Sequence, residues 1–138
     1  MIIRGIGPAL RDLWGVGGVL LDPKLEVFRQ GGPKLAENDN WETPIGTASG
    51  TGAQLASIFG QAGAFALAQG SKDAALLTNL LPGNYTLQVS GVNNATGAAT
   101  SARVRARFHG ITPARAKCSV APLTTRTLQL RLTIGSRR

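Results

Sequence analysis

The residues whose types could do chemistry include one short polar run, Asn38, Asp39 and Asn40. Their side chains carry the oxygen atoms that calcium prefers, so they are the candidate metal ligands, although the spacing is not that of an EF-hand loop. The alternative, which we favour, is an Asx-type turn whose side chains bond local backbone N–H groups. Trp41, which follows directly, is expected to be a packing anchor.

Thiol chemistry would require His109 and Cys118, the single histidine and the single cysteine, in contact with each other. Nothing in the sequence orients that pair, and structural zinc needs about four ligands. The glycines at positions 15, 17 and 18 lack the Lys-Ser/Thr of a phosphate-binding loop and are interpreted as turns. We therefore expect no enzyme and no cofactor other than the calcium candidate.

Charge is the third chemical signal, and it divides the chain. The first 98 residues carry six basic and seven acidic side chains, whereas the last 40 carry nine basic and no acidic ones, for a net charge of +8. The candidate ligands for nucleic-acid phosphates or anionic lipid headgroups are Arg103, Arg105, Arg107, Arg115, Lys117, Arg126 and Arg131. Only Phe108 interleaves as an aromatic, so we favour a solvated strand face or an accidental coding tail.

Short strands separated by turn residues are expected to position these groups. Residues 1–6 are apolar and β-branched until Gly7-Pro8 stops the strand. Residues 24–27 alternate apolar and charged side chains, which is typical of a strand with one buried face, and residues 34–37 form the return strand.

One short helix is predicted near residues 53–59, where Leu55, Ile58 and Phe59 recur at helical spacing. Residues 74–80 and 85–90 are predicted to pair as an antiparallel hairpin, because Pro-Gly between them suits a type II turn.

The basic tail also alternates, which predicts closing strands at residues 102–108 and 127–134. Many short strands with Gly/Pro turns indicate an all-β fold, an antiparallel, jelly-roll-like β-sandwich. We divide it into a body, residues 1–98, and a basic tail, residues 99–138.

The 138 residues fit one domain. No apolar run approaches the roughly 20 residues that cross a bilayer, and the first residues lack the charged and apolar regions of a signal peptide.

The body resembles a repeated β-sandwich module of large bacterial secreted and surface proteins. The matching blocks are IRGIGPAL (3–10), VGGVLLDPKLEV (16–27), NDNW (38–41), GSKDAALL (70–77), LPGNYT (81–86) and SGVNNATG (90–97). The likeness covers about residues 2–98, and the module is broadly similar to the bacterial pre-peptidase C-terminal domains, which are non-catalytic. The resemblance implies an extracellular or cell-surface location. Its implied partners are neighbouring modules of a longer parent protein or a surface ligand.

After residue 97 the family pattern continues with an apolar, acid-containing closing strand, whereas this chain turns basic. We hypothesise that residues 98–138 are a replaced or frame-shifted tail and that the start at Met1 truncates a longer secreted parent. The first functional hypothesis is a non-enzymatic module acting as a spacer, adhesion or accessory binding unit. The second is a small cationic protein that binds nucleic acid or anionic membrane surfaces through its Arg-rich end.

Overall fold

The computed structural model describes residues 1–43, 45, 50–81, 83–104, 121–123 and 125–132, and beyond Ser101 it describes the backbone alone. These residues form mostly strands, arranged in two four-stranded sheets with antiparallel pairing between neighbours. The predicted all-β class is confirmed.

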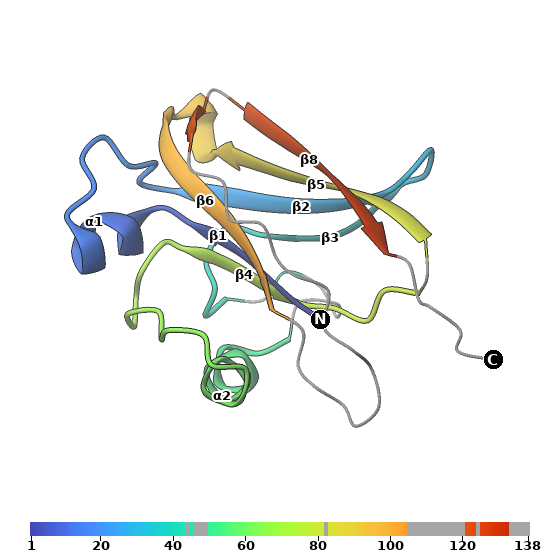
Figure 1. Cartoon of the computed structure of the whole chain (residues 1–138), viewed down its shortest axis with the longest axis horizontal. Coiled ribbons are helices and arrows are strands. Elements are labelled where there is room, and N and C mark those ends of the chain that lie inside the picture. The colour runs from blue at the N-terminus through green and yellow to red at the C-terminus, as the bar shows by residue number, and fades with distance from the viewer. Residues whose placement is uncertain (44, 46–49, 82, 105–120, 124, 133–138) are drawn as a thin grey trace.

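Each sheet combines strands from the body and from the tail (Figure 1). In the first sheet the order is β4 (Ala74–Leu77), β1 (Ile2–Ile6), β6 (Gly97–Val104) and β7 (Ala121–Leu123). In the second the order is β3 (Lys34–Asn38), β2 (Pro23–Arg29), β5 (Gly83–Gly91) and β8 (Thr125–Leu132).

The predicted strands at 1–6, 24–27 and 34–37 are confirmed as β1, β2 and β3. The first closing strand, predicted at 102–108, begins earlier than predicted, because β6 starts at Gly97. Strand β6 therefore crosses the boundary drawn between body and tail. Residues 105–108 lie outside the described residues. The second, predicted at 127–134, is found as β8, which begins at Thr125, while residues 133 and 134 lie outside the described residues.

Strand β1 is buried on both faces, which explains why it is apolar except for the buried Arg4. Ile3 belongs to an apolar cluster that also contains Leu25, Leu87 and Val89 of the second sheet, so the two sheets share one core. Ile2 and the rest of the opposite face of β1 pack against a second cluster. That cluster contains Leu55 and Phe59 of α2 (Gly52–Gln61), which lies on the far side of the first sheet in Figure 1.

Two α-helices and one short 3-10 helix, η1 (Val92–Asn94), are present in the described residues, so the prediction of a single helix was wrong. Helix α2 extends the predicted 53–59 segment and begins with a capping box between Thr51 and Gln54. The missed helix, α1, spans Pro8–Trp14. Pro8 does end β1, but its fixed φ also suits the first position of a helix, and Gly15 closes that helix with a φ of 68°.

The predicted hairpin between residues 74–80 and 85–90 was also wrong. Strand β4 pairs with β1, whereas β5 pairs with β2 and β8, so the two segments belong to different sheets. The proline of the predicted turn, at position 82, lies outside the described residues. The alternation in Tyr85, Leu87 and Val89 was interpreted correctly, since all three are buried.

No helix in the described part of the chain has the length and apolar character needed to cross a membrane.

Candidate functional site

Asn38 is the last residue of β3, and Asp39 and Asn40 lie in the bend that follows it. Asn38 bonds local carbonyl groups instead of the local backbone N–H groups expected of an Asx-type turn. Asn38 is fully buried, and its Nδ2 donates to the carbonyl oxygens of Asn40 and Thr43, each at 2.9 Å. Its Oδ1 accepts from the backbone N–H of Ala75 at 3.1 Å. The side-chain amide of Asn38 therefore uses its hydrogen bonds to hold the turn against β4. Calcium binding here stays a prediction that rests on Asp39 and Asn40.

Trp41 is buried, as expected of a packing anchor. It is 5% exposed, its ring lies 5.9 Å from that of Phe59, and its Nε1 donates to the carbonyl of Ala68 at 3.1 Å. The turn is thus fixed on both sides of Asp39, by Asn38 and by Trp41.

An open pocket of about 400 Å³ lies beside Asp39. It occupies the outer face of the second sheet, because Lys24, Glu26 and Ser90 alternate along their strands with side chains of the shared core. The lining residues are Lys24, Glu26, Glu37, Asp39, Ile45, Ser90, Gly91, Val92, Asn93 and Asn94.

Three charged side chains of this pocket form a neutral cluster with Lys34, which lies beside it. Glu26 and Glu37 are directly opposed across β2 and β3. Lys24 Nζ lies 3.4 Å from Glu26 Oε1 and 3.1 Å from Glu37 Oε2, and Lys34 Nζ lies 3.2 Å and 2.6 Å from the same two atoms. The hydrogen bond from Lys34 is the main cause that lowers the pKa of Glu37. Hydrogen bonds to Glu37 in turn raise the pKa of both lysines.

Asp39 differs from these carboxylates, because it makes no hydrogen bond or ion pair with any described residue and is half-buried. The nearby Lys72 is engaged elsewhere, with its Nζ 2.6 Å from Asp22 Oδ2. That hydrogen bond is the main cause that raises the pKa of Lys72, and the charge of Asp39 adds to it. Asp39 therefore presents a negative charge to the pocket that no hydrogen bond or ion pair with a described residue offsets directly.

Asn93 and Asn94 supply two amides to the same pocket from the turn that follows β5. Both have left-handed backbone conformations, with φ of 55° and 59°. Asparagine tolerates this region better than most residues. The turn is closed by hydrogen bonds from Val92 N to Asp22 O at 2.9 Å and from Ala95 N to Val92 O at 3.1 Å. Neither amide side chain bonds to another described residue.

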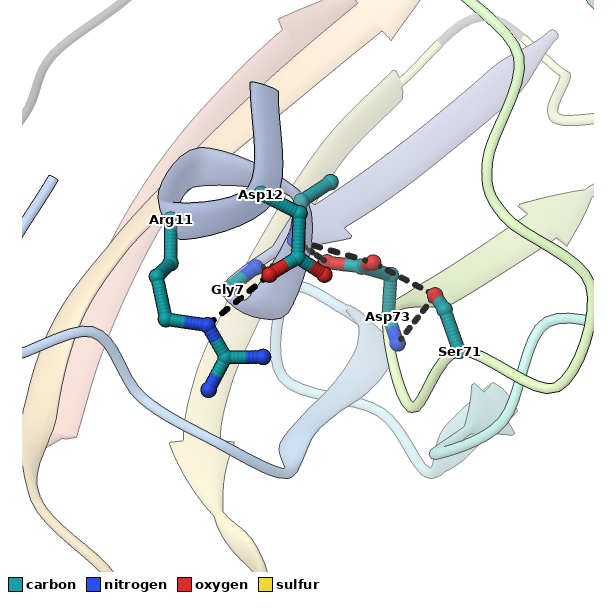
Figure 2. A network of polar contacts seen from close by, with 6 residues as sticks. Gly7, Arg11, Asp12, Ser71 and Asp73 are labelled. Carbon is teal, nitrogen blue, oxygen red and sulfur yellow. Dashed lines mark hydrogen bonds and ion pairs between the residues drawn. The ribbon is translucent and has the colours of Figure 1, made fainter. Parts of the chain in front are cut away.

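A second polar group lies beneath α1 and is fully enclosed (Figure 2). The carboxylate of Asp73 is 0% exposed and accepts from the backbone N–H groups of Gly7, at 2.8 Å, and Ala9, at 3.2 Å. The hydroxyl of Ser71 donates to it as well. A carboxylate that accepts hydrogen bonds from the unpaired backbone N–H groups at a helix N-terminus stabilises the fold. Asp73 is therefore not available to the pocket or to a cation.

Arg4, on the α2 side of β1, is the other buried charge. Its guanidinium carbon lies 4.5 Å from the ring centre of Phe59 and 4.1 Å from that of Phe65. Burial lowers the pKa of Arg4 to about 10, against a smaller opposing effect of Asp73. Its Nε and Nη2 have no hydrogen-bond partner. Stacking on two aromatic rings and the charge of Asp73 stabilise the buried positive charge of Arg4 in place of a direct ion pair.

Among the described residues, none of the other predicted site residues lies at the pocket. The side chains of Arg103, Arg105, Arg107, Arg115, Lys117, Arg126 and Arg131 lie outside the described residues, as do His109 and Cys118. Gly15, Gly17 and Gly18 are exposed turn residues. Among the described residues, no three His, Cys, Asp or Glu side chains are grouped to hold a metal ion.

Of the pocket residues, the sequence interpretation singled out Asp39 and missed Asn93, Asn94 and Ser90. The Asn-Asn pair after Gly91 was a usable signal, because asparagine is enriched where φ is positive. Comparison with protein-family models, curated proteins and solved structures finds no match to this chain.

Proposed function

We propose that this chain is a non-enzymatic, jelly-roll-like β-sandwich module that binds a ligand in the pocket on the outer face of its second sheet. One observation carries the proposal: Asp39, Ser90, Asn93 and Asn94 surround an open pocket without a partner among the described residues. Polar groups that converge on a concavity and are left unsatisfied by the fold are the usual mark of a binding site.

The pairing of the other carboxylates supports binding rather than catalysis. Glu26 and Glu37 are each contacted by two lysines, and the pKa of Glu37 is lowered. A catalytic acid or base at neutral pH needs a carboxyl pKa that is raised instead. The described carboxylates of the pocket are thus suited to orienting a ligand.

The resemblance of residues 2–98 supports a place for this module in a secreted or cell-surface bacterial protein. There it would act as an adhesion, spacer or accessory binding unit beside further modules of a longer parent. Sequencing of the flanking DNA tests this context. A long open frame that encodes further copies is the expected result, and unrelated flanking frames would contradict it.

The binding proposal is tested by a fragment screen on the isotope-labelled full chain, read from its backbone amide spectrum. The library holds neutral, cationic and anionic small molecules in equal parts. We expect saturable shifts that cluster on residues 37–39 and 90–94. Hits that are confined to other surfaces, or a complete lack of hits, would contradict the proposal.

The polyanion-binding alternative rests on the nine basic and no acidic residues of the last 40. Counterion release makes such binding strongly salt-dependent. Retention on a heparin column that falls steeply with salt, together with loss of retention after truncation at residue 104, would favour this alternative. Elution at the lowest salt concentration would remove it.

A further inference from the structure

We infer that the pocket beside Asp39 is built for a neutral, polyhydroxylated ligand, that is, one or a few sugar residues of a carbohydrate chain. This inference rests on the proposed binding function and specifies the chemistry of its ligand. It follows from the mixture of hydrogen-bonding groups, the local charge and the fixed geometry of the 90–94 turn.

The unpaired groups combine three kinds of hydrogen-bonding behaviour. The carboxylate of Asp39 only accepts, the amides of Asn93 and Asn94 both donate and accept, and the hydroxyl of Ser90 does either. A sugar hydroxyl is itself both a donor and an acceptor, so neighbouring hydroxyls can use all of these groups. An ammonium group only donates and would leave the amide N–H groups unmatched, whereas a phosphate only accepts and would face the carboxylate of Asp39.

Local charge agrees with a neutral ligand. Glu26 and Glu37 are balanced by Lys24 and Lys34, and Asp22 is balanced by Lys72. One uncompensated charge therefore remains among these side chains, the carboxylate of Asp39. A charged hydrogen-bond acceptor strengthens a bond to a neutral hydroxyl without requiring a charged ligand.

Two aliphatic side chains add an apolar part to the pocket. Val92 is half-buried in the 90–94 turn, and Ile45 is 39% exposed beside Glu37, with which it forms an isolated bridge. The C–H face of a sugar ring can cover such aliphatic surface while its hydroxyls bond to the polar groups. The volume of about 400 Å³ lies in the range of roughly 300–1,000 Å³ typical of small-molecule sites.

The backbone that carries the two amides is held in place before any ligand arrives. A Cβ atom on Gly91 would lie only 2.0 Å from the carbonyl oxygen of Ala95 and 2.8 Å from Leu20 Cδ1, so the turn is packed closely against the body. Hydrogen bonds at Val92 and Ala95 close it on both sides. A preorganised turn loses little freedom on binding, which favours affinity.

The test titrates neutral trisaccharides of glucose, mannose, galactose, xylose and N-acetylglucosamine into the isotope-labelled full chain, with pentalysine as a cationic comparator. At least one trisaccharide is expected to shift the amides of Glu37, Asp39 and residues 90–94 in a saturable, salt-independent way. Asn93→Gly keeps the left-handed backbone, since glycine adopts positive φ freely, and removes only the amide. It should weaken binding about tenfold, a loss typical of one good hydrogen bond. Asp39→Ala should weaken binding by at least as much.

The matched control is Asn79→Ala, an exposed asparagine between β4 and β5 and outside the pocket, which should bind like the wild type. If pentalysine shifts the pocket amides and no trisaccharide does, the carbohydrate inference is overturned while the proposed binding function stands. If trisaccharides bind equally well to wild type, Asn93→Gly and Asp39→Ala, the inference is also wrong. If neither these probes nor the fragment library shift the pocket amides, the proposed function itself fails.

Discussion

Asp73 and Asp39 are aspartates at strand ends, one directly before β4 and the other directly after β3, yet their surroundings are opposite. Asp73 is fully buried and accepts from two backbone N–H groups and one hydroxyl. Asp39 is half-buried at an open pocket and has no partner among the described residues. The difference separates a charge that the fold already uses from one that we propose binds another molecule.

The largest effect is expected where the buried charge is removed. Asp73→Ala leaves the N–H groups of Gly7 and Ala9 without their acceptor and leaves Arg4 buried without the favourable charge of Asp73. We expect a loss of about 3–5 kcal/mol in the free energy of unfolding, measured in urea. Asp73→Asn keeps one acceptor oxygen and should lose less. A loss below about 1 kcal/mol in Asp73→Ala would show that this carboxylate is not structural.

The next effect is expected at Asn38, the buried neighbour of Asp39. Asn38→Ala removes an acceptor for Ala75 N and a donor to two carbonyls, all in the interior. We expect a loss of about 2–3 kcal/mol, because buried groups left unpaired are costly. Asn40→Ala is the matched control, and its half-buried side chain should cost less than about 0.5 kcal/mol. Equal losses in both variants would remove the distinction between the two positions.

A smaller effect depends on pH and concerns Glu37. Its pKa is lowered in the folded state, chiefly by the hydrogen bond from Lys34. Its contribution to stability is therefore present above the ordinary glutamate value of 4.5 and is lost as pH falls below that value. Glu37→Gln should be less stable than the wild type at neutral pH, and this difference should shrink as the pH falls below 4.5. A stability difference that grows on acidification would contradict the assigned ion cluster.

The smallest effect on stability is expected in the pocket itself. Asn93→Gly and Asp39→Ala remove groups that are unpaired in the fold, so each should remain within about 0.5 kcal/mol of the wild type. Thermal unfolding of both variants beside Asn79→Ala measures this directly. A loss of more than about 2 kcal/mol in either would place that side chain with Asp73, among the groups that hold the fold together.

Local patterns in the sequence predicted those elements that one segment specifies by itself. The alternation in residues 24–27 is the pattern of β2, and the spacing of Leu55 and Phe59 gave α2. Helix α1 carried its own signal in Pro8, which was interpreted as the end of a strand, and in Gly15, which was interpreted as a turn residue. The pairing of β5 could not be inferred from its neighbour β4, because the chain crosses between sheets after Leu77.

The candidate site was predictable only in part, for the same reason. Asp39 is recognisable as a polar turn residue, but nothing local places it beside Asn93, which is distant in the chain. Their place in one pocket depends on β2 lying between β3 and β5. The structural role of Asp73 is equally hard to predict from local sequence, since its backbone donors, Gly7 and Ala9, lie at the start of α1.

The most direct test measures stability and binding on the same two variants, Asp73→Asn and Asn93→Gly, below the temperature at which either unfolds. Urea unfolding reports the free energy, and titration with the tightest-binding trisaccharide or fragment reports affinity. We predict that Asp73→Asn loses stability and keeps wild-type affinity, while Asn93→Gly keeps stability and binds about tenfold more weakly. Wild-type affinity in Asn93→Gly, or weakened binding in a fully folded Asp73→Asn, would contradict the account.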